Sequence, residues 1–242
     1  MIRFKRLIAC GFALGLFATT ARAEVALPAN YTQLDYIQST GLEWIDTGYK
    51  PGYRTVTTME AIPVDVSYKC AFFGCWMESG SGFSYGMYLN GNKNLAATFK
   101  GTGTGDWKSN QKPPTAGATY KMMLDGPNHK SYYWKNGALD DTLSHDAVAS
   151  GSSTSSMLIF ATRVNNGAAT YPSKIKFLSM QITEGGTTVR DFVPVRRSDG
   201  VVGLLDLAHL GTDTEFYVNK GTGTFTAGAV TGFIFTRPGS AE

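Results

Sequence analysis

The chain has 242 residues, with 22 basic and 19 acidic side chains and a formal net charge of +3. Four of the basic side chains, and none of the acidic ones, lie in the first 23 residues, so the other 219 residues carry 18 basic and 19 acidic side chains. A near-neutral chain without basic runs lacks the clustered electropositive face that nucleic acids require, which argues against a nucleic-acid partner.

The N-terminus has the order of a secretory signal peptide. Basic residues at positions 3, 5 and 6 precede the uncharged, mostly apolar stretch 7–20, and Ala21-Arg22-Ala23 supplies a small-x-small cleavage pattern. We therefore predict a signal peptide over 1–23 and a secreted, periplasmic or cell-surface protein without stable membrane insertion after cleavage. Two alternatives stay open. One is a retained anchor, although about 14 residues are short against the roughly 20 that a spanning helix needs. The other is lipid attachment at Cys10, because Leu7-Ile8-Ala9-Cys10 has the letters of a lipoprotein box.

Residues 24–242 are predicted to form one all-β domain. Short apolar runs recur, bounded by Gly, Asn, Asp, Ser or Pro, which is typical of a sandwich or barrel of antiparallel strands. The predicted strands are 34–38, 44–47, 54–62, 67–76, 83–89, 95–100, 119–125, 130–135, 157–163, 174–183 and 187–194. Asn90-Gly91 and Asn136-Gly137 are typical hairpin dipeptides. The stretches 101–117 and 147–156 are rich in Gly, Ser and Thr and are predicted to be surface loops.

Strict alternation places apolar side chains on both faces of the predicted strand 174–183. Ile175 and Phe177 point to one face, and Met180 and Ile182 point to the other. Both faces are therefore expected to be partly apolar, as in a central strand with one face on the core and the other lining a groove or covered by loops.

Two cysteines, Cys70 and Cys75, follow the predicted signal peptide. In one extended strand they would lie about 5 × 3.3 Å apart and point to opposite faces, too far for a disulfide. A tight turn between them would bring them together. Two half-buried free thiols are the default expectation.

Three blocks of the sequence resemble laminin G-like, concanavalin A-type jelly-roll domains of bacterial and phage surface proteins. They are QLDYIQSTGLEWIDTGY at 33–49, SMLIFATRVNNG at 156–167 with the strand that follows, and TTVRDFVPVRRSDGVVGLLDL at 187–207 with VNKGTGTFTAG at 218–228. Trp44 and the cysteine pair depart from the usual pattern. The resemblance implies a two-sheet antiparallel jelly-roll sandwich over 24–242 and no single function, since such domains include lectins, protein-binding and adhesion modules, and enzymes.

The sequence contains no convincing catalytic motif. Retaining sugar hydrolysis in this fold class uses alternate carboxylates on one strand, and the closest match, Glu43 and Asp46, would point to opposite faces. There is no G-x-S-x-G elbow, and the three histidines are scattered among turn-like residues. We therefore expect a non-enzymatic protein.

Aromatic rings beside polar groups are the candidates for ligand binding, because sugars stack their CH faces on rings and pair their hydroxyls with amides. Trp107 attracts most interest, since a tryptophan in a polar loop has few core partners to explain it. The predicted ligand-binding residues are Tyr85, Tyr88, Trp107, Trp134, Asn165 and Asn166.

No cofactor is predicted, although calcium at the loop rims stays open. Asp106, Asp125 and Asp146 are weak candidate ligands without a D-x-D-x-D-G loop. The favoured function is a secreted binding module for a glycan or surface polymer, with the ligand residues around one concavity. An envelope structural or adhesion protein that binds other proteins is the alternative, and a divergent glycoside hydrolase is the third possibility.

Overall fold

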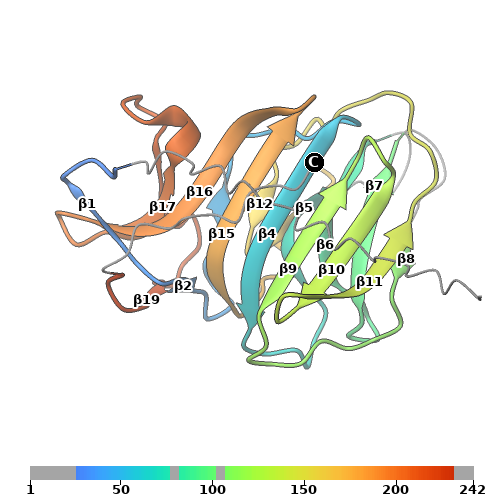
Figure 1. The fold of residues 1–242 in the computed structure, drawn as a ribbon, viewed down its shortest axis with the longest axis horizontal. Coiled ribbons are helices and arrows are strands. Elements are labelled where there is room, and N and C mark those ends of the chain that lie inside the picture. Colours follow the sequence, from blue (N-terminus) through green and yellow to red (C-terminus); the bar gives the residue numbers. More distant parts are fainter. Residues whose placement is uncertain (1–25, 77–81, 102–106, 232–242) are drawn as a thin grey trace, which may run out of the picture.

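The computed structural model describes residues 26–76, 82–101 and 107–231. The predicted signal peptide and Asp106 lie outside these ranges. The described chain folds into two β-sheets packed face to face, with β4, β9 and β10 in front of β5 and β6 in Figure 1. This confirms the predicted all-β jelly-roll sandwich. Among the residues that the structure describes, no helix is long and apolar enough to cross a membrane.

The first sheet carries the longest strands, β4, β15 and β16. Its order is β11 (Ala138–Ser144), β10 (Lys130–Lys135), β9 (Tyr120–Asp125), β4 (Thr55–Pro63), β15 (Ile175–Glu184), β16 (Thr187–Arg197), β17 (Val202–Asp206) and β18 (Phe216–Tyr217). At its margins lie β1 (Tyr31–Gln33) on β16, and β2 (Ile37–Gln38) between β15 and β19 (Thr226–Ala227). All of these pairs are antiparallel.

The second sheet has fewer strands than the first. Its order is β14 (Ala169–Thr170), β13 (Thr162–Val164), β5 (Cys70–Trp76), β6 (Ser84–Leu89), β7 (Leu95–Lys100) and β8 (Trp107–Ser109), with β12 (Leu158–Ile159) joining β5 to β3 (Ile45–Asp46). The pair of β13 with β5 is parallel. A single 3₁₀ turn among the described residues, η1 (Leu207–His209), follows β17.

One continuous apolar core fills the space between the sheets. It includes Phe73, Tyr85 and Phe99 from the second sheet and Tyr133 and Phe177 from the first, all fully buried. Burial of about 25 cal/mol per Å² of apolar surface makes this layer the main stabilising contribution. A smaller cluster of buried residues lies on the outer face of the second sheet, made of Ala71, Trp76, Tyr88 and Ala96.

The predicted disulfide alternative is wrong, because Cys70 and Cys75 are both free. Both thiols are fully buried and point into the core. Alternation predicts that they point to opposite faces of the sheet, but the pairing of β5 with β6 shifts register between Ala71 and Phe73. Such a bulge reverses the alternation of the residues beyond it. Burial raises the pKa of each thiol to about 12.

The C-terminal stretch returns to the start of the sandwich, where β19 pairs with β2. Beside this pair the Glu43 carboxylate is fully buried. It accepts hydrogen bonds from the Ser39 hydroxyl (3.0 Å), the Thr40 amide (2.7 Å) and hydroxyl (2.9 Å), and the Leu42 amide (3.3 Å). A Cβ atom at Gly223 would overlap this carboxylate, so the glycine allows the C-terminal stretch to cover it. Burial alone would raise the pKa of Glu43, but the donors outweigh it and lower the pKa.

Candidate functional site

The outer face of the second sheet carries a row of small residues across three strands. Gly74 of β5 pairs with Gly86 of β6, and Gly86 pairs with Thr98 of β7, which in turn pairs with Trp107 of β8. Side chains at paired positions point to the same face of a sheet. The row therefore leaves space above β5 to β7 and places the Trp107 ring at its end.

Trp76 fills this space. A Cβ atom at Gly74 or at Gly86 would lie 3.0 or 3.1 Å from the Trp76 Nε1 atom, so the indole lies directly over the glycine pair. Only 2% of Trp76 is exposed, although it lies outside the core between the sheets. Glycine at both positions is what permits so close an approach of a ring to the sheet.

Three further rings surround Trp76. Tyr88 meets it edge to face at a centroid distance of 4.9 Å, Trp107 does so at 5.5 Å, and Tyr171 is tilted against it at 5.5 Å. Tyr88 and Trp107 also contact each other edge to face at 5.7 Å. These are favourable geometries for aromatic pairs, so the four rings hold one another in place.

Trp107 is the exposed member of the group, with 43% of its surface accessible. It borders a groove of about 330 Å³, which we call the aromatic groove. The residues lining the groove are Lys69, Trp76, Tyr88, Asn90, Gly91, Trp107, Lys108 and Ser109. The groove therefore combines an exposed indole with amide, hydroxyl and ammonium groups, which is the composition expected of a site for a polar ligand with an apolar face.

Two buried polar atoms on this face of the sheet lack hydrogen-bond partners among the described residues, the Trp76 Nε1 and the Thr98 Oγ1. The Lys69 ammonium lies 3.9 Å from the Tyr171 ring centroid and 5.7 Å from that of Trp76, within cation–π range. Lys108 is 3.9 Å from Asp146.

The structure brings together only some of the predicted ligand-binding residues. Tyr88 and Trp107 share the aromatic groove. Tyr85 does not, because alternation along β6 turns it into the core, where its hydroxyl donates to the Leu124 carbonyl at 2.8 Å; the expectation that this ring faces solvent is wrong. Trp134 stacks on Tyr132 on the outer face of the first sheet, on the other side of the sandwich.

Asn165 and Asn166 form the exposed turn between β13 and β14, both with positive φ. The Asn165 amide donates to the Trp76 carbonyl at 2.8 Å, so this turn is tied to the end of β5. The Asn166 side chain accepts hydrogen bonds from the Thr154 and Ser155 hydroxyls. The turn therefore lies next to Trp76 at the end of β5, but neither asparagine is one of the residues that line the aromatic groove.

Sequence reasoning missed Trp76, Lys69 and Tyr171. The available signal was the pair of glycines in the two adjacent predicted strands 67–76 and 83–89, because a glycine pair on one face leaves space for a large ring.

The two calcium candidates that the structure describes, Asp125 and Asp146, do not belong to a group of metal-ligating side chains. Both carboxylate oxygens of Asp125 accept hydrogen bonds from Asn128, at 3.1 Å from its amide and 2.9 Å from its side chain. Asp146 is exposed beside Lys108. Within residues 26–76, 82–101 and 107–231, no three His, Cys, Asp or Glu side chains are grouped so that they could hold a metal ion.

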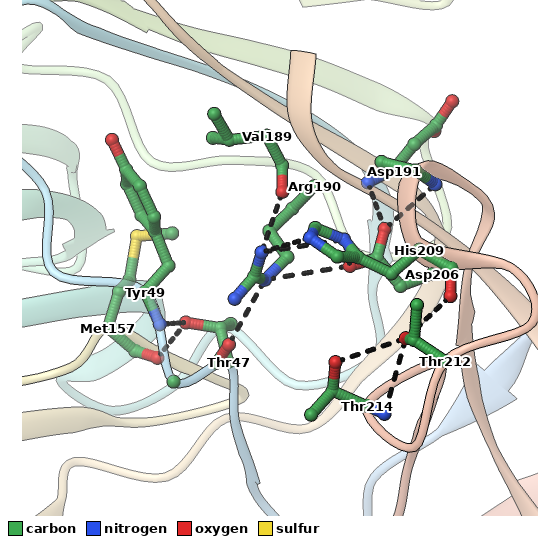
Figure 2. Close-up of polar contacts among 12 residues, drawn as sticks. Thr47, Tyr49, Met157, Val189, Arg190, Asp191, Asp206, His209, Thr212 and Thr214 are labelled. Atoms are coloured by element: carbon green, nitrogen blue, oxygen red, sulfur yellow. Dashed lines mark hydrogen bonds and ion pairs between the residues drawn. The ribbon is translucent and has the colours of Figure 1, made fainter.

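A second polar cluster lies at the end of the first sheet, where Figure 2 shows Arg190 and His209 converging on Asp206. The Asp206 carboxylate is fully buried, accepts from His209 Nδ1 at 2.8 Å and the Asp191 amide at 2.7 Å, and lies 3.5 Å from Arg190 Nε. The Arg190 Nη1 atom also lies 3.3 Å from His209 Nε2 and 3.5 Å from His209 Nδ1, so the guanidinium covers the imidazole edge beside the carboxylate. The cluster therefore fastens η1 to β16 and is structural.

None of the described residues that line the aromatic groove is suited to acid–base hydrolysis of a glycosidic bond. The groove lining includes no Asp, Glu or His residue among those described, whereas glycoside hydrolysis needs two carboxyl groups flanking the bond. The chemistry available at this surface is stacking, hydrogen bonding and charge pairing, which are the interactions of binding.

No family model matches the chain, and no curated protein matches its sequence. Several solved structures resemble it. A Bacteroides ovatus protein to which carbohydrate binding is ascribed has a TM-score of 0.50 at 11% identity, with 82% of this chain and 60% of that chain covered. A SAP-like pentraxin from Limulus polyphemus has a TM-score of 0.45 at 12% identity, with 86% and 99% covered. The CBM40 module of the Ruminococcus gnavus IT-sialidase has a TM-score of 0.41 at 13% identity, with 63% and 90% covered. At 11% identity, the likeness to the Bacteroides ovatus protein establishes a shared fold and no function.

Proposed function

We propose that this protein is a non-catalytic binding module that recognises a glycan or surface polymer in the aromatic groove, and that it acts outside the cytoplasm after cleavage behind Ala23. The observation that carries the proposal is Trp107, a ring with 43% of its surface exposed that is fixed edge to face against two buried rings. A rigid exposed indole beside Asn90 and Ser109 suits the apolar face and the hydroxyl groups of a sugar.

Preorganisation is the physical advantage of this arrangement. Trp107 loses little side-chain freedom on binding because Trp76 and Tyr88 already hold it, and immobilising a free side chain costs about 0.5–1.5 kcal/mol. The fold shared with the Bacteroides ovatus protein, to which carbohydrate binding is ascribed, supports the class of function and names no ligand for this chain.

The test is a glycan array followed by titration of the strongest hit, using the protein that begins at Glu24. Trp107→Ala should weaken binding at least thirtyfold, the effect of losing about 2 kcal/mol at a central aromatic contact. Trp134→Ala makes the same truncation on the other side of the sandwich and should leave affinity unchanged. If binding fails with Trp134→Ala and persists with Trp107→Ala, the aromatic groove is not the site. If the wild-type protein binds no glycan or surface polymer, the proposed function is wrong.

A further inference from the structure

We propose that the ligand of the aromatic groove is a negatively charged saccharide, whose carboxylate or sulfate group pairs with Lys69 while a sugar ring stacks on Trp107. The inference rests on the proposed function and deepens it by naming the class of ligand. It is carried by the charges of the groove and by the position of Lys69 among the rings.

Among the described residues that line the aromatic groove, all the charged side chains have the same sign. Lys69 and Lys108 contribute two ammonium groups, and none of these described residues is Asp or Glu. With the chain as a whole near neutrality, and with Lys108 paired with Asp146, the charge of Lys69 makes the groove locally positive. A neutral sugar would gain nothing from that charge, whereas an anionic one is attracted to it.

The two lysines differ in how their charge is compensated. Lys108 is paired with Asp146 at 3.9 Å. The acidic residue before Lys69 in the chain, Asp65, is engaged elsewhere, since it accepts two hydrogen bonds from Ser67 and pairs with Lys174 at 3.2 Å. Within the described chain, Lys69 is therefore left with rings as its neighbours and no carboxylate in salt-bridge range.

The rings hold the Lys69 ammonium in a defined position. It is half-buried, 3.9 Å from the Tyr171 ring centroid and 5.7 Å from that of Trp76. An ammonium on an aromatic floor has lost part of its hydration, so a charge-assisted hydrogen bond to an anion is stronger there than in open solvent.

Geometry connects this cation to the exposed indole. The centroid of Trp107 lies 5.5 Å from that of Trp76, and the Lys69 Nζ lies 5.7 Å from the same point. These two distances limit the separation of Lys69 from the Trp107 ring to about 11 Å, a span that one or two sugar rings can cover. A single anionic saccharide can therefore contact both.

The test compares matched glycans and matched variants. The glycans are an oligogalacturonide and its methyl ester, a sulfated galactan oligosaccharide and its desulfated form, and an array of neutral and acidic glycans that supplies further pairs. The variants are Lys69→Gln, Lys69→Arg and Lys121→Gln. Lys121 is a fitting control because it also lies over a ring, 5.2 Å from the Trp134 centroid, but on the first sheet.

We expect the charged member of a pair to bind at least tenfold more tightly than its neutral counterpart, with affinity falling as salt is raised. Lys69→Gln should remove that preference and most of the salt dependence, Lys69→Arg should retain both, and Lys121→Gln should change neither. A thermal melt of each variant verifies folding. Whether carboxylated or sulfated glycans bind identifies the source of the charge.

The outcomes separate the two proposals. If neutral glycans bind as tightly as acidic ones, or if Lys69→Gln keeps the preference, the inference about charge is overturned and the binding function stands. If no glycan of either kind binds the wild-type protein, the proposed function itself fails.

Discussion

Gly86→Ala tests whether the glycine pair beneath Trp76 builds the aromatic groove. A Cβ atom at this position would lie 2.5 Å from the Phe73 carbonyl oxygen, 2.8 Å from Gly74 Cα and 3.1 Å from Trp76 Nε1. The first two contacts are with backbone atoms of the neighbouring strand, which cannot rotate away. The methyl group must therefore separate β5 from β6 or displace the indole.

Overpacking of this kind costs about 1–3 kcal/mol. For a domain of this size, each kcal/mol lowers the melting temperature by about 2–4 °C, so the expected decrease is about 2–12 °C. Because Trp76 supports Trp107, the fluorescence spectrum and the affinity for a groove ligand should change together with stability.

Gly91→Ala is the matched control. Gly91 also lines the aromatic groove, but a Cβ atom there would meet nothing within 4 Å. Both variants would be compared with the wild-type protein by thermal melts, urea titration and tryptophan fluorescence. If Gly86→Ala has the same melting temperature and the same fluorescence spectrum as the wild-type protein, then the glycine pair does not position Trp76.

Three further predictions concern the scaffold. Glu43→Gln should lower the free energy of unfolding by about 1–3 kcal/mol at pH 7, because an amide cannot satisfy all the donors that face the carboxylate. Because the pKa of Glu43 is lowered in the folded state, its contribution to the free energy of unfolding is complete above the ordinary value of 4.5 and is lost as pH falls through the folded-state pKa. Urea titrations at pH 7 and at pH 3 should therefore show a smaller difference in stability between wild-type and variant at the lower pH. Asp206→Asn should lower the free energy of unfolding by about 3–5 kcal/mol, because it leaves the largely buried Arg190 without its carboxylate. As a control, Asp199→Asn removes an exposed ion pair and should leave the urea midpoint unchanged. Both buried thiols should resist iodoacetamide at pH 8 in the folded protein and react in urea, as measured by peptide mass spectrometry; rapid labelling without urea would contradict their burial.

The strands that face the core could be predicted well from the sequence. The predicted strands 95–100 and 130–135 coincide with β7 and β10. β8 lies in the stretch 101–117, where we predicted a surface loop, and β11 lies where we predicted no strand. β11 is largely exposed and carries adjacent acidic residues, so no burial pattern marks it, and β8 is a three-residue strand within a glycine-rich stretch. The predicted strand 157–163 is divided into β12 and β13 around Phe160, whose φ of 68° no periodicity reveals.

The face to which a side chain points was less predictable, because alternation fails where a strand carries a bulge. In β15 the pairing shifts register between Phe177 and Ser179, and residues on both sides of the shift, Ile175 and Met180 among them, face the core. The expectation that Met180 and Ile182 point to the face opposite Ile175 and Phe177 was wrong for that reason. Single-residue irregularities depend on the partner strand and leave little trace in local sequence.

The same kind of irregularity creates the aromatic groove. With strict alternation, Trp76 would share a face with Cys70 and Phe72, both of which are core residues, and would point between the sheets. The register shift after Ala71 allows Phe72 and Phe73 both to face the core, so the residues beyond it change sides. Trp76 therefore emerges on the outer face over its two glycines and supports Trp107. An extra residue in one strand thus moves a tryptophan out of the core and makes it the base of the aromatic groove, which is why the groove could be derived only from the strand pairing.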